Sequence, residues 1–139
     1  MKLMKMTRLS ALLLAGTMSL AFAHDVSETV KQGKPEIKNL MTKALKGADG
    51  IEVIMSHVAL PPNFTLPKHW HPGEEFAYML QGSVTLVLEN EGEMVLTQDQ
   101  TGVVPLKKIH SARSGENGAT ILVFRVHEQG QPGRVLVKE

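Results

Sequence analysis

The sequence predicts an all-β domain that folds as an antiparallel sandwich or barrel. From residue 51 onward, short segments rich in Val, Ile and Leu follow one another, and clusters of Pro, Gly and Asn separate them. Closely spaced strands with short connections are typical of antiparallel sandwiches and barrels. Only 4% of the residues are aromatic, so aliphatic side chains and Met must fill the core.

Each predicted strand is a run of apolar and β-branched residues between two turn signals. The strands are expected at residues 51–60, 76–80, 83–88, 94–97, 103–104, 120–126 and 135–137. The turns are expected at residues 61–63, 72–73, 81–82, 90–92 and 115–118. We expect Gly82 to form a tight turn between two strands, because glycine adopts positive φ at little cost.

The segment before residue 51 gives a different signal. Its apolar residues recur with helical spacing, and Pro35 suits the start of a helix. These apolar residues are Ile37, Leu40, Met41, Ala44 and Leu45. Taken alone, this periodicity predicts a helix. Residues 24–36 are polar and irregular, which predicts a flexible amino-terminal arm.

The first 23 residues have the composition of a secretory signal peptide. Three basic residues precede an apolar run at residues 9–20, and the segment closes with Ala-Phe-Ala. The apolar run is too short for a permanent membrane anchor. We therefore expect a Sec-type signal peptide over residues 1–23, cleaved after Ala23, and a periplasmic or secreted mature protein without a membrane anchor. The barrel domain is then expected at residues 37–139.

Charge and cysteine content exclude several functions. Removal of residues 1–23 would delete three basic and no acidic residues, so the net charge would fall from +1 to −2. A mildly acidic chain without clusters of Lys or Arg offers no electrostatic footprint for nucleic acid. The chain contains no Cys, which excludes disulfides, thiolate ligands and thiol nucleophiles. Any metal ligands must therefore be imidazoles and carboxylates.

Four residues predict a metal site. His69 and His71 stand two apart, so their side chains project from the same face of a strand. Residues 72–73 then bend the chain, which lets Glu75 at the start of the next strand reach the same point. His110, beyond a run of short strands, supplies a third imidazole. The predicted ligands are His69, His71, Glu75 and His110.

This spacing resembles the first motif of the cupin superfamily. That motif has two His separated by one residue, then a Glu three or four residues later, and a Gly six residues beyond the Glu. His69, His71, Glu75 and Gly82 match it. The resemblance covers roughly residues 50 to 128.

The second cupin motif is present in part, at Pro105 and His110. Lys107 stands in the place of its Gly, Ser114 stands where the family often has Asn, and residues 98–99 are Gln-Asp where the family often has Gly-Asp. His110 itself occupies the place of the expected ligand.

The resemblance implies a single cupin barrel, that is, a jelly roll or double-stranded β-helix. It implies a strand around residues 37–41, where periodicity alone predicts a helix. Segments 71–78 and 128–132 are similar to small single-domain cupins related to quercetin dioxygenase. Many cupins are homodimers, so the resemblance also implies a homodimer.

The metal and the reaction stay open at this stage. Imidazoles suit Fe, Zn, Cu and Ni, and a carboxylate adds Mn; uptake outside the cytoplasm favours Cu(II) or Zn by intrinsic affinity. We expect one divalent transition metal and a dioxygenase-like enzyme with an unidentified small organic substrate, in which Glu75 also acts as general base. The alternatives are a cupin isomerase and a module that binds a metal or small molecule without turnover.

Few other polar residues are candidates for a substrate pocket. These are His57, Gln81 and Arg125, although His57 suits burial in the core better than a pocket. His24 would become the first residue after cleavage and could bind Cu(II), an arrangement that chance explains equally well. His127 receives no assignment.

The strand that follows Glu75 has two distinct faces. If Glu75 points into the barrel, Ala77 and Met79 do so as well, while Phe76 and Tyr78 lie on the opposite face. An apolar patch there would favour a dimer or would pack beneath the amino-terminal arm.

Overall fold

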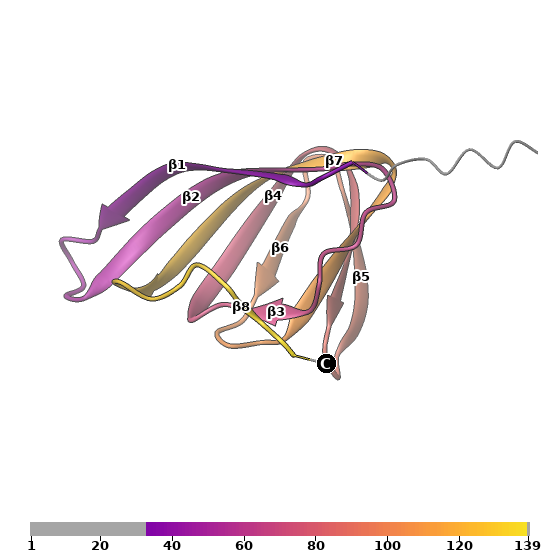
Figure 1. Cartoon of the computed structure of the whole chain (residues 1–139). Helices are drawn as coiled ribbons and strands as arrows, with labels where there is room; N and C mark the ends of the chain where they lie inside the picture. Colours follow the sequence, from indigo (N-terminus) through magenta and orange to yellow (C-terminus); the bar gives the residue numbers. More distant parts are fainter. Residues whose placement is uncertain (1–32, 139) are drawn as a thin grey trace, which may run out of the picture.

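The protein is described by a computed structural model of residues 33–138, in which every regular element is a β-strand (Figure 1). The strands are β1 (Glu36–Ala44), β2 (Ile51–Leu60), β3 (His69–Trp70), β4 (Gly73–Leu88), β5 (Gly92–Thr97), β6 (Thr101–Val104), β7 (His110–Glu128) and β8 (Val135–Leu136). No helix within this range is long and apolar enough to cross a membrane. The predicted signal peptide and most of the predicted arm lie outside the described residues.

All eight strands belong to one antiparallel sheet. β7 pairs with β2, β3 and β4, while β4 also pairs with β5 and β6. The ends of the sheet are β1, which pairs with β2, and β8, which pairs with β3. The sheet curls around one interior (Figure 1), so the predicted all-β barrel is confirmed.

Two strands, β4 and β7, are longer than predicted, because each runs through residues that were expected to form a turn. β4 joins the strands predicted at residues 76–80 and 83–88, and β7 contains residues 115–118, which were predicted as a turn. Gly82 (φ 76°) and Gly118 (φ 72°) have the positive φ of turn residues, but the register of β4 shifts around Gly82 instead of reversing. The prediction of tight turns there is wrong, because positive-φ glycines also form bulges that bend a continuing strand.

β1 is a strand and not the helix that periodicity predicts. It pairs with β2 from Glu36 opposite Ala59 to Ala44 opposite Glu52, and each of its residues is exposed. The apolar stripe of a helix forms only against a core that buries it, and here backbone pairing with an open strand edge prevails. The strand implied by the family resemblance is therefore confirmed, and it continues to Ala44.

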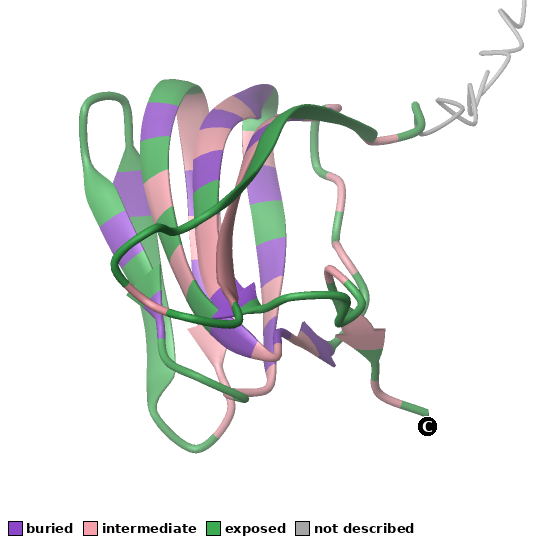
Figure 2. Cartoon of the chain, turned by 90° about the vertical axis from the view of Figure 1, so that its left-hand side faces the viewer, coloured by how far each residue is buried: buried purple, intermediate pink, exposed green. Residues whose placement is uncertain are grey.

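The inner face of the curled sheet carries the core. Buried residues alternate with partly buried or exposed ones in parts of β4 and β7 and in the second half of β2, and Figure 2 shows such banding along the strands. The buried hydrophobic cluster consists of Val58, Leu60, Met79, Val84, Leu96, Ala112, Ala119, Ile121 and Val123. Its members come from β2, β4, β5 and β7, so the core forms only when the sheet curls.

The outer face carries an exposed apolar row. Met55, Phe124, Phe76 and Val103 stand opposite one another across β2, β7, β4 and β6. Phe76, Val103 and Phe124 are exposed, and so is Tyr78, as predicted for the face opposite Glu75. The homodimer stays a prediction.

The bend in β4 gives a test of stability. A Cβ on Gly82 would overlap the backbone of Gly118, and residue 82 has positive φ. We predict that Gly82→Ala lowers the free energy of unfolding by about 2–5 kcal/mol, since left-handed φ costs about 1–2 and overpacking about 1–3. Gly47→Ala is the control, because a Cβ there would meet nothing within 4 Å. Equal urea midpoints for the two variants would contradict the prediction.

Candidate metal centre

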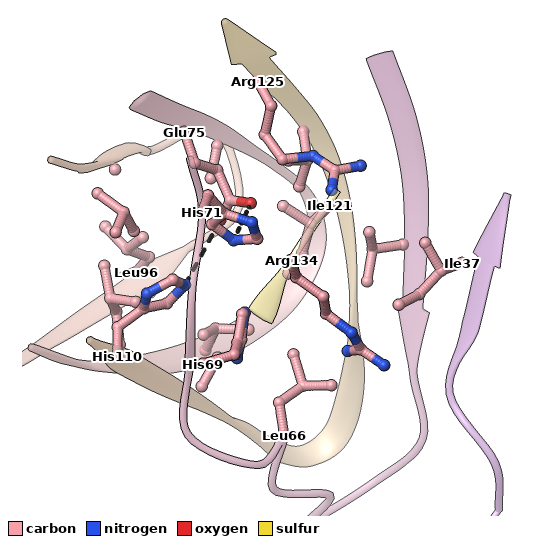
Figure 3. Close-up of a pocket in the computed structure, with 18 of the residues that line it drawn as sticks. Ile37, Leu66, His69, His71, Glu75, Leu96, His110, Ile121, Arg125 and Arg134 are labelled. Atoms are coloured by element: carbon pink, nitrogen blue, oxygen red, sulfur yellow. Dashed lines mark ion pairs between the residues drawn. The ribbon is translucent and has the colours of Figure 1, made fainter. Parts of the chain in front are cut away.

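The curled sheet brings together three histidines from two segments that lie far apart in the sequence. His69 lies in β3, His71 follows that strand, and His110 begins β7, where it pairs directly with His69. All three are buried, with exposed fractions of 3–5%, and one ligand atom from each lies within 4.8 Å of the others. Figure 3 shows the three rings converging on one side of the interior.

Each imidazole is oriented by a backbone carbonyl. His69 Nδ1 donates to the carbonyl of Pro67 (2.7 Å), His71 Nδ1 to that of Gly133 (2.6 Å) and His110 Nδ1 to that of Lys108 (2.9 Å). A carbonyl can only accept, so Nδ1 must carry the proton in all three rings. The neutral ring then has a free lone pair on Nε2, which is the form that binds a metal.

The free nitrogens fit a metal ion. Nε2 of His71 and of His110 are buried without a hydrogen-bond partner among residues 33–138, which is costly for polar atoms unless something binds there. Glu75 lies beside both: Oε2 is 2.9 Å from His71 Nε2 without hydrogen-bond geometry, and Oε1 is 4.0 Å from His110 Nε2. Three imidazoles facing one point are a suitable donor set for a transition metal. Glu75 as fourth ligand stays a prediction.

Burial governs the titration of these groups. Desolvation lowers the pKa of His69 from 6.5 to about 4, against the opposing hydrogen bond to Pro67. Desolvation also lowers the pKa of His110. Burial alone would raise the pKa of Glu75, but the contact with His71 and the charges of His71, His110 and Arg125 outweigh it and hold the pKa below its usual value. Burial therefore favours the neutral forms of His69 and His110, while the surrounding groups favour the ionised form of Glu75.

A cavity of about 90 Å³ adjoins the histidines. Most of its wall is apolar, and Ala77, Met79, Ile121 and Val123 belong to it. Its remaining polar lining consists of Glu75, Arg125 and Arg134. The cavity therefore combines a ligand cluster, an apolar wall and two guanidinium groups.

Of the pocket residues expected from the sequence, Arg125 lines the cavity, whereas His57 and Gln81 do not. His57 stands opposite Leu122 on the outer face, and Gln81 is exposed. Sequence reasoning missed Arg134, which lies beyond the recognisable motifs. The one local signal is Pro132-Gly133, which predicts a turn before the short strand β8.

Two of the residues that differ from the second cupin motif, Lys107 and Ser114, make hydrogen bonds that support the site. Lys107, in place of Gly, adopts φ 58°, and its N–H donates to the carbonyl of His71. Ser114, in place of Asn, is buried; its Oγ donates to the carbonyl of Pro61 and accepts from the N–H of Phe64. These bonds fasten the loop that leads into β3. Lys107 and Ser114 thus hold the segments on which two ligands stand.

His127, which the sequence left unassigned, is also buried. Neither of its ring nitrogens has a hydrogen-bond partner, and Nε2 lies 3.8 Å from Glu52 Oε1. It stands on the inner face of β7, two residues beyond Arg125. A Cβ on Gly73, which pairs with His127, would overlap the Cβ of His127, so only glycine fits opposite it.

The fold and the cluster define a small β-barrel protein with three histidines directed at one internal point. The family model described as Cupin domain matches residues 56–126, about half of the chain. The chain therefore belongs to the cupin family, as its motifs predicted.

Solved structures show the same fold at low identity. DMSP lyase DddQ from Ruegeria pomeroyi is 20% identical, with a TM-score of 0.59 over 74% of this chain and 51% of its own. A cupin 2 conserved barrel domain protein from Leptotrichia buccalis is 19% identical, with a TM-score of 0.59 over 69% and 42%. Oxalate decarboxylase from Bacillus subtilis is 21% identical, with a TM-score of 0.55 over 61% and 24%. The chain thus spans about half or less of each, and no curated protein matches its sequence.

The lowered pKa of His69 predicts how the stability of the metal-free protein depends on pH. The folded state favours neutral His69, so this contribution is complete above about pH 6.5 and is lost as the pH falls toward about 4. We expect the free energy of unfolding, measured by urea denaturation with chelator present, to decrease over this range. His69→Gln should make the decrease shallower, whereas His57→Gln should not. A slope unchanged in His69→Gln would contradict the prediction.

Proposed function

We propose that the chain is an exported, metal-dependent cupin enzyme that acts on a small organic molecule. The observation that carries the proposal is the orientation of three buried imidazoles: each donates Nδ1–H to a backbone carbonyl. The three residues are thereby able to offer ligand atoms within 4.8 Å of one another. Histidines that bind metals commonly make such a bond with the other ring nitrogen.

The three imidazoles of His69, His71 and His110 would hold the metal, and Glu75 is the proposed fourth ligand. A bound divalent metal would supply a Lewis acid that polarises an oxygen of the substrate. The imidazoles suit Fe, Zn, Cu, Ni or Mn together with a carboxylate. The similar oxalate decarboxylase of Bacillus subtilis has Mn(II) centres, which supports Mn as one candidate.

Glu75 is the proposed proton acceptor. It is the only carboxylate among the residues that line the cavity, and it lies beside His71 and His110. Its lowered pKa keeps it ionised at neutral pH, so its oxygens can accept a proton from a substrate bound in the cavity. The apolar wall around it limits access of water to that step.

The class of reaction is proposed from similarity. A dioxygenase-like reaction follows from the resemblance to cupins related to quercetin dioxygenase, whereas two similar structures are a lyase and a decarboxylase. The second candidate is a cupin that binds a small molecule or metal without turnover. The observation that favours this candidate is the largely apolar wall of the cavity, which offers few groups for chemistry. Isomerisation is a third candidate within the same fold.

Export is proposed from composition alone. The basic residues, apolar run and Ala-Phe-Ala sequence at residues 1–23 support a signal peptide and a periplasmic location. A protein exported unfolded would acquire its metal after export, where affinity favours Cu(II) or Zn.

Metal binding is tested by removing one imidazole at a time. We predict that the wild type binds about one divalent metal per chain and that His71→Ala weakens binding by more than about 100-fold, because one of only four proposed ligands is lost. His57→Ala is the matched control, since His57 lies on the outer face. Plasma mass spectrometry gives the metal content, and a rise in Tm on metal addition gives a second readout. Absence of binding to Fe(II), Mn(II), Ni(II), Zn(II) and Cu(II) would overturn the proposal.

The proposed role of Glu75 is tested with an isosteric change. We predict that Glu75→Gln retains metal, because the three imidazoles remain and an amide oxygen can still coordinate, but lowers kcat by about 10²–10⁴, the usual contribution of a general base. Oxygen consumption with a panel of phenolic and flavonoid substrates is the first assay. Glu74→Gln, on the exposed face of the same strand, should keep full turnover. Unchanged turnover in Glu75→Gln would contradict the role, and no turnover by the wild type across the panel would favour the binding module.

A further inference from the structure

Arg134 occupies a defined place beside the histidine cluster. It lies between Gly133, whose carbonyl accepts hydrogen bonds from His71 Nδ1 and Arg125 Nη1, and Val135, which pairs with Trp70 in β3. The backbone on each side of Arg134 is therefore fastened to the ligand-bearing segments. Figure 3 shows its side chain among the residues that line the cavity, between His69 and Ile37.

The charge of Arg134 is not neutralised within the described part of the chain. Its side chain is exposed and makes no hydrogen bond or ion pair with any residue from 33 to 138. Nearby Arg125 donates to the carbonyl of Gly133 and to Ser56 Oγ, but its buried Nε has no acceptor. Two guanidinium groups thus line one cavity with donors to spare, a situation that an anion would relieve.

The net charge of the cavity lining also favours an anion as the ligand. Among the residues described as lining the cavity, Arg125 and Arg134 are cationic and Glu75 is the one carboxylate. The lining is therefore net positive before a divalent metal is added, and a metal would make it more so. A neutral substrate would leave their charge unbalanced, whereas a carboxylate balances it and matches the planar fork of a guanidinium.

The rest of the cavity wall indicates the size and polarity of the remaining part of the ligand. Apolar side chains from β2, β4, β5, β6 and β7 form most of the lining. The cavity of about 90 Å³ equals the liquid volume of about three waters at about 30 Å³ each. This volume suits a short organic chain.

From these observations we infer that the cavity binds a small organic carboxylate, with its carboxylate on Arg134 and its apolar part against the wall of the barrel. The inference rests on the proposed function, because it names the ligand class of the same site. Arg134 is a specificity-determining residue for that ligand. Arg125, held by two hydrogen bonds, positions the segment that carries Arg134.

Butyrate and its uncharged isostere butyramide test the inference. Each probe is titrated by NMR into the wild type, Arg134→Gln and Arg113→Gln, metal-free and loaded with zinc. Arg113 is the matched control, because it is exposed and lies outside the cavity. We expect the wild type to prefer butyrate over butyramide by about tenfold or more and Arg134→Gln to lose that preference, as expected for a charge-assisted hydrogen bond. Arg113→Gln should behave as the wild type does.

The outcomes separate the inference from the proposed function. Butyrate binding that is equal in the wild type and Arg134→Gln, or equal for butyrate and butyramide, would overturn the inference and leave metal binding intact. If zinc fails to bind, the proposed function fails, and the metal-free titration still decides the role of Arg134. Chemical-shift spectra of all three proteins establish that each variant is folded.

Discussion

Three hydrogen bonds from imidazole Nδ1 atoms to backbone carbonyls determine what the site can do. The carbonyls belong to Pro67, Lys108 and Gly133, which lie on three separate segments. A backbone carbonyl cannot move without moving its segment, so the tautomer and direction of each ring are properties of the fold. The histidines are therefore arranged before any metal binds, and burial lowers the pKa of His69 and of His110, which favours the neutral form that binds a metal. Because they must be deprotonated to bind, metal affinity and the stability of the fold are coupled.

The long pair of strands β4 and β7 makes this arrangement geometrically feasible. They pair from Gly73 opposite His127 to Leu88 opposite His110, with both strands bent near Gly82 and Gly118. One continuous strand can thus place Glu75 beside β3 and also contribute to the far wall of the core. The two glycines stand close together, since a Cβ on Gly82 would overlap the backbone of Gly118. The bulges that let the sheet close on itself therefore produce its curvature and also bring the site residues together.

Features of the fold and the site that depend on nearby residues could be predicted from the sequence, whereas those that depend on long-range pairing could not. The two-residue spacing of His69 and His71 fixes their common face locally, and the family motif adds Glu75 and His110. Turns and bulges both use positive-φ glycine, so the sequence around Gly82 could not tell a hairpin from a bent strand. The helical periodicity before residue 45 misled because β1 buries nothing against the core. Arg134 could not be predicted, because the long-range pairing of β8 with β3 and the hydrogen bonds to the Gly133 carbonyl bring its segment to the cavity.

Residues that break local rules gather around this cavity, and their cost is an argument that the cavity has a function. Lys107 holds a left-handed φ of 58°, which costs a non-glycine residue about 1–2 kcal/mol, while its N–H binds the carbonyl of His71. Among the described residues, five buried side-chain nitrogens have no hydrogen-bond partner, and such groups cost about 1–3 kcal/mol each. Two of the five belong to His127, and the other three, on His71, His110 and Arg125, belong to residues that line the cavity. An apolar interior of the same shape would be more stable, so stability alone does not account for these residues. A metal at the imidazoles and an anion at the guanidinium groups would give these three nitrogens partners, and this is the physical reason to regard the two as parts of one site.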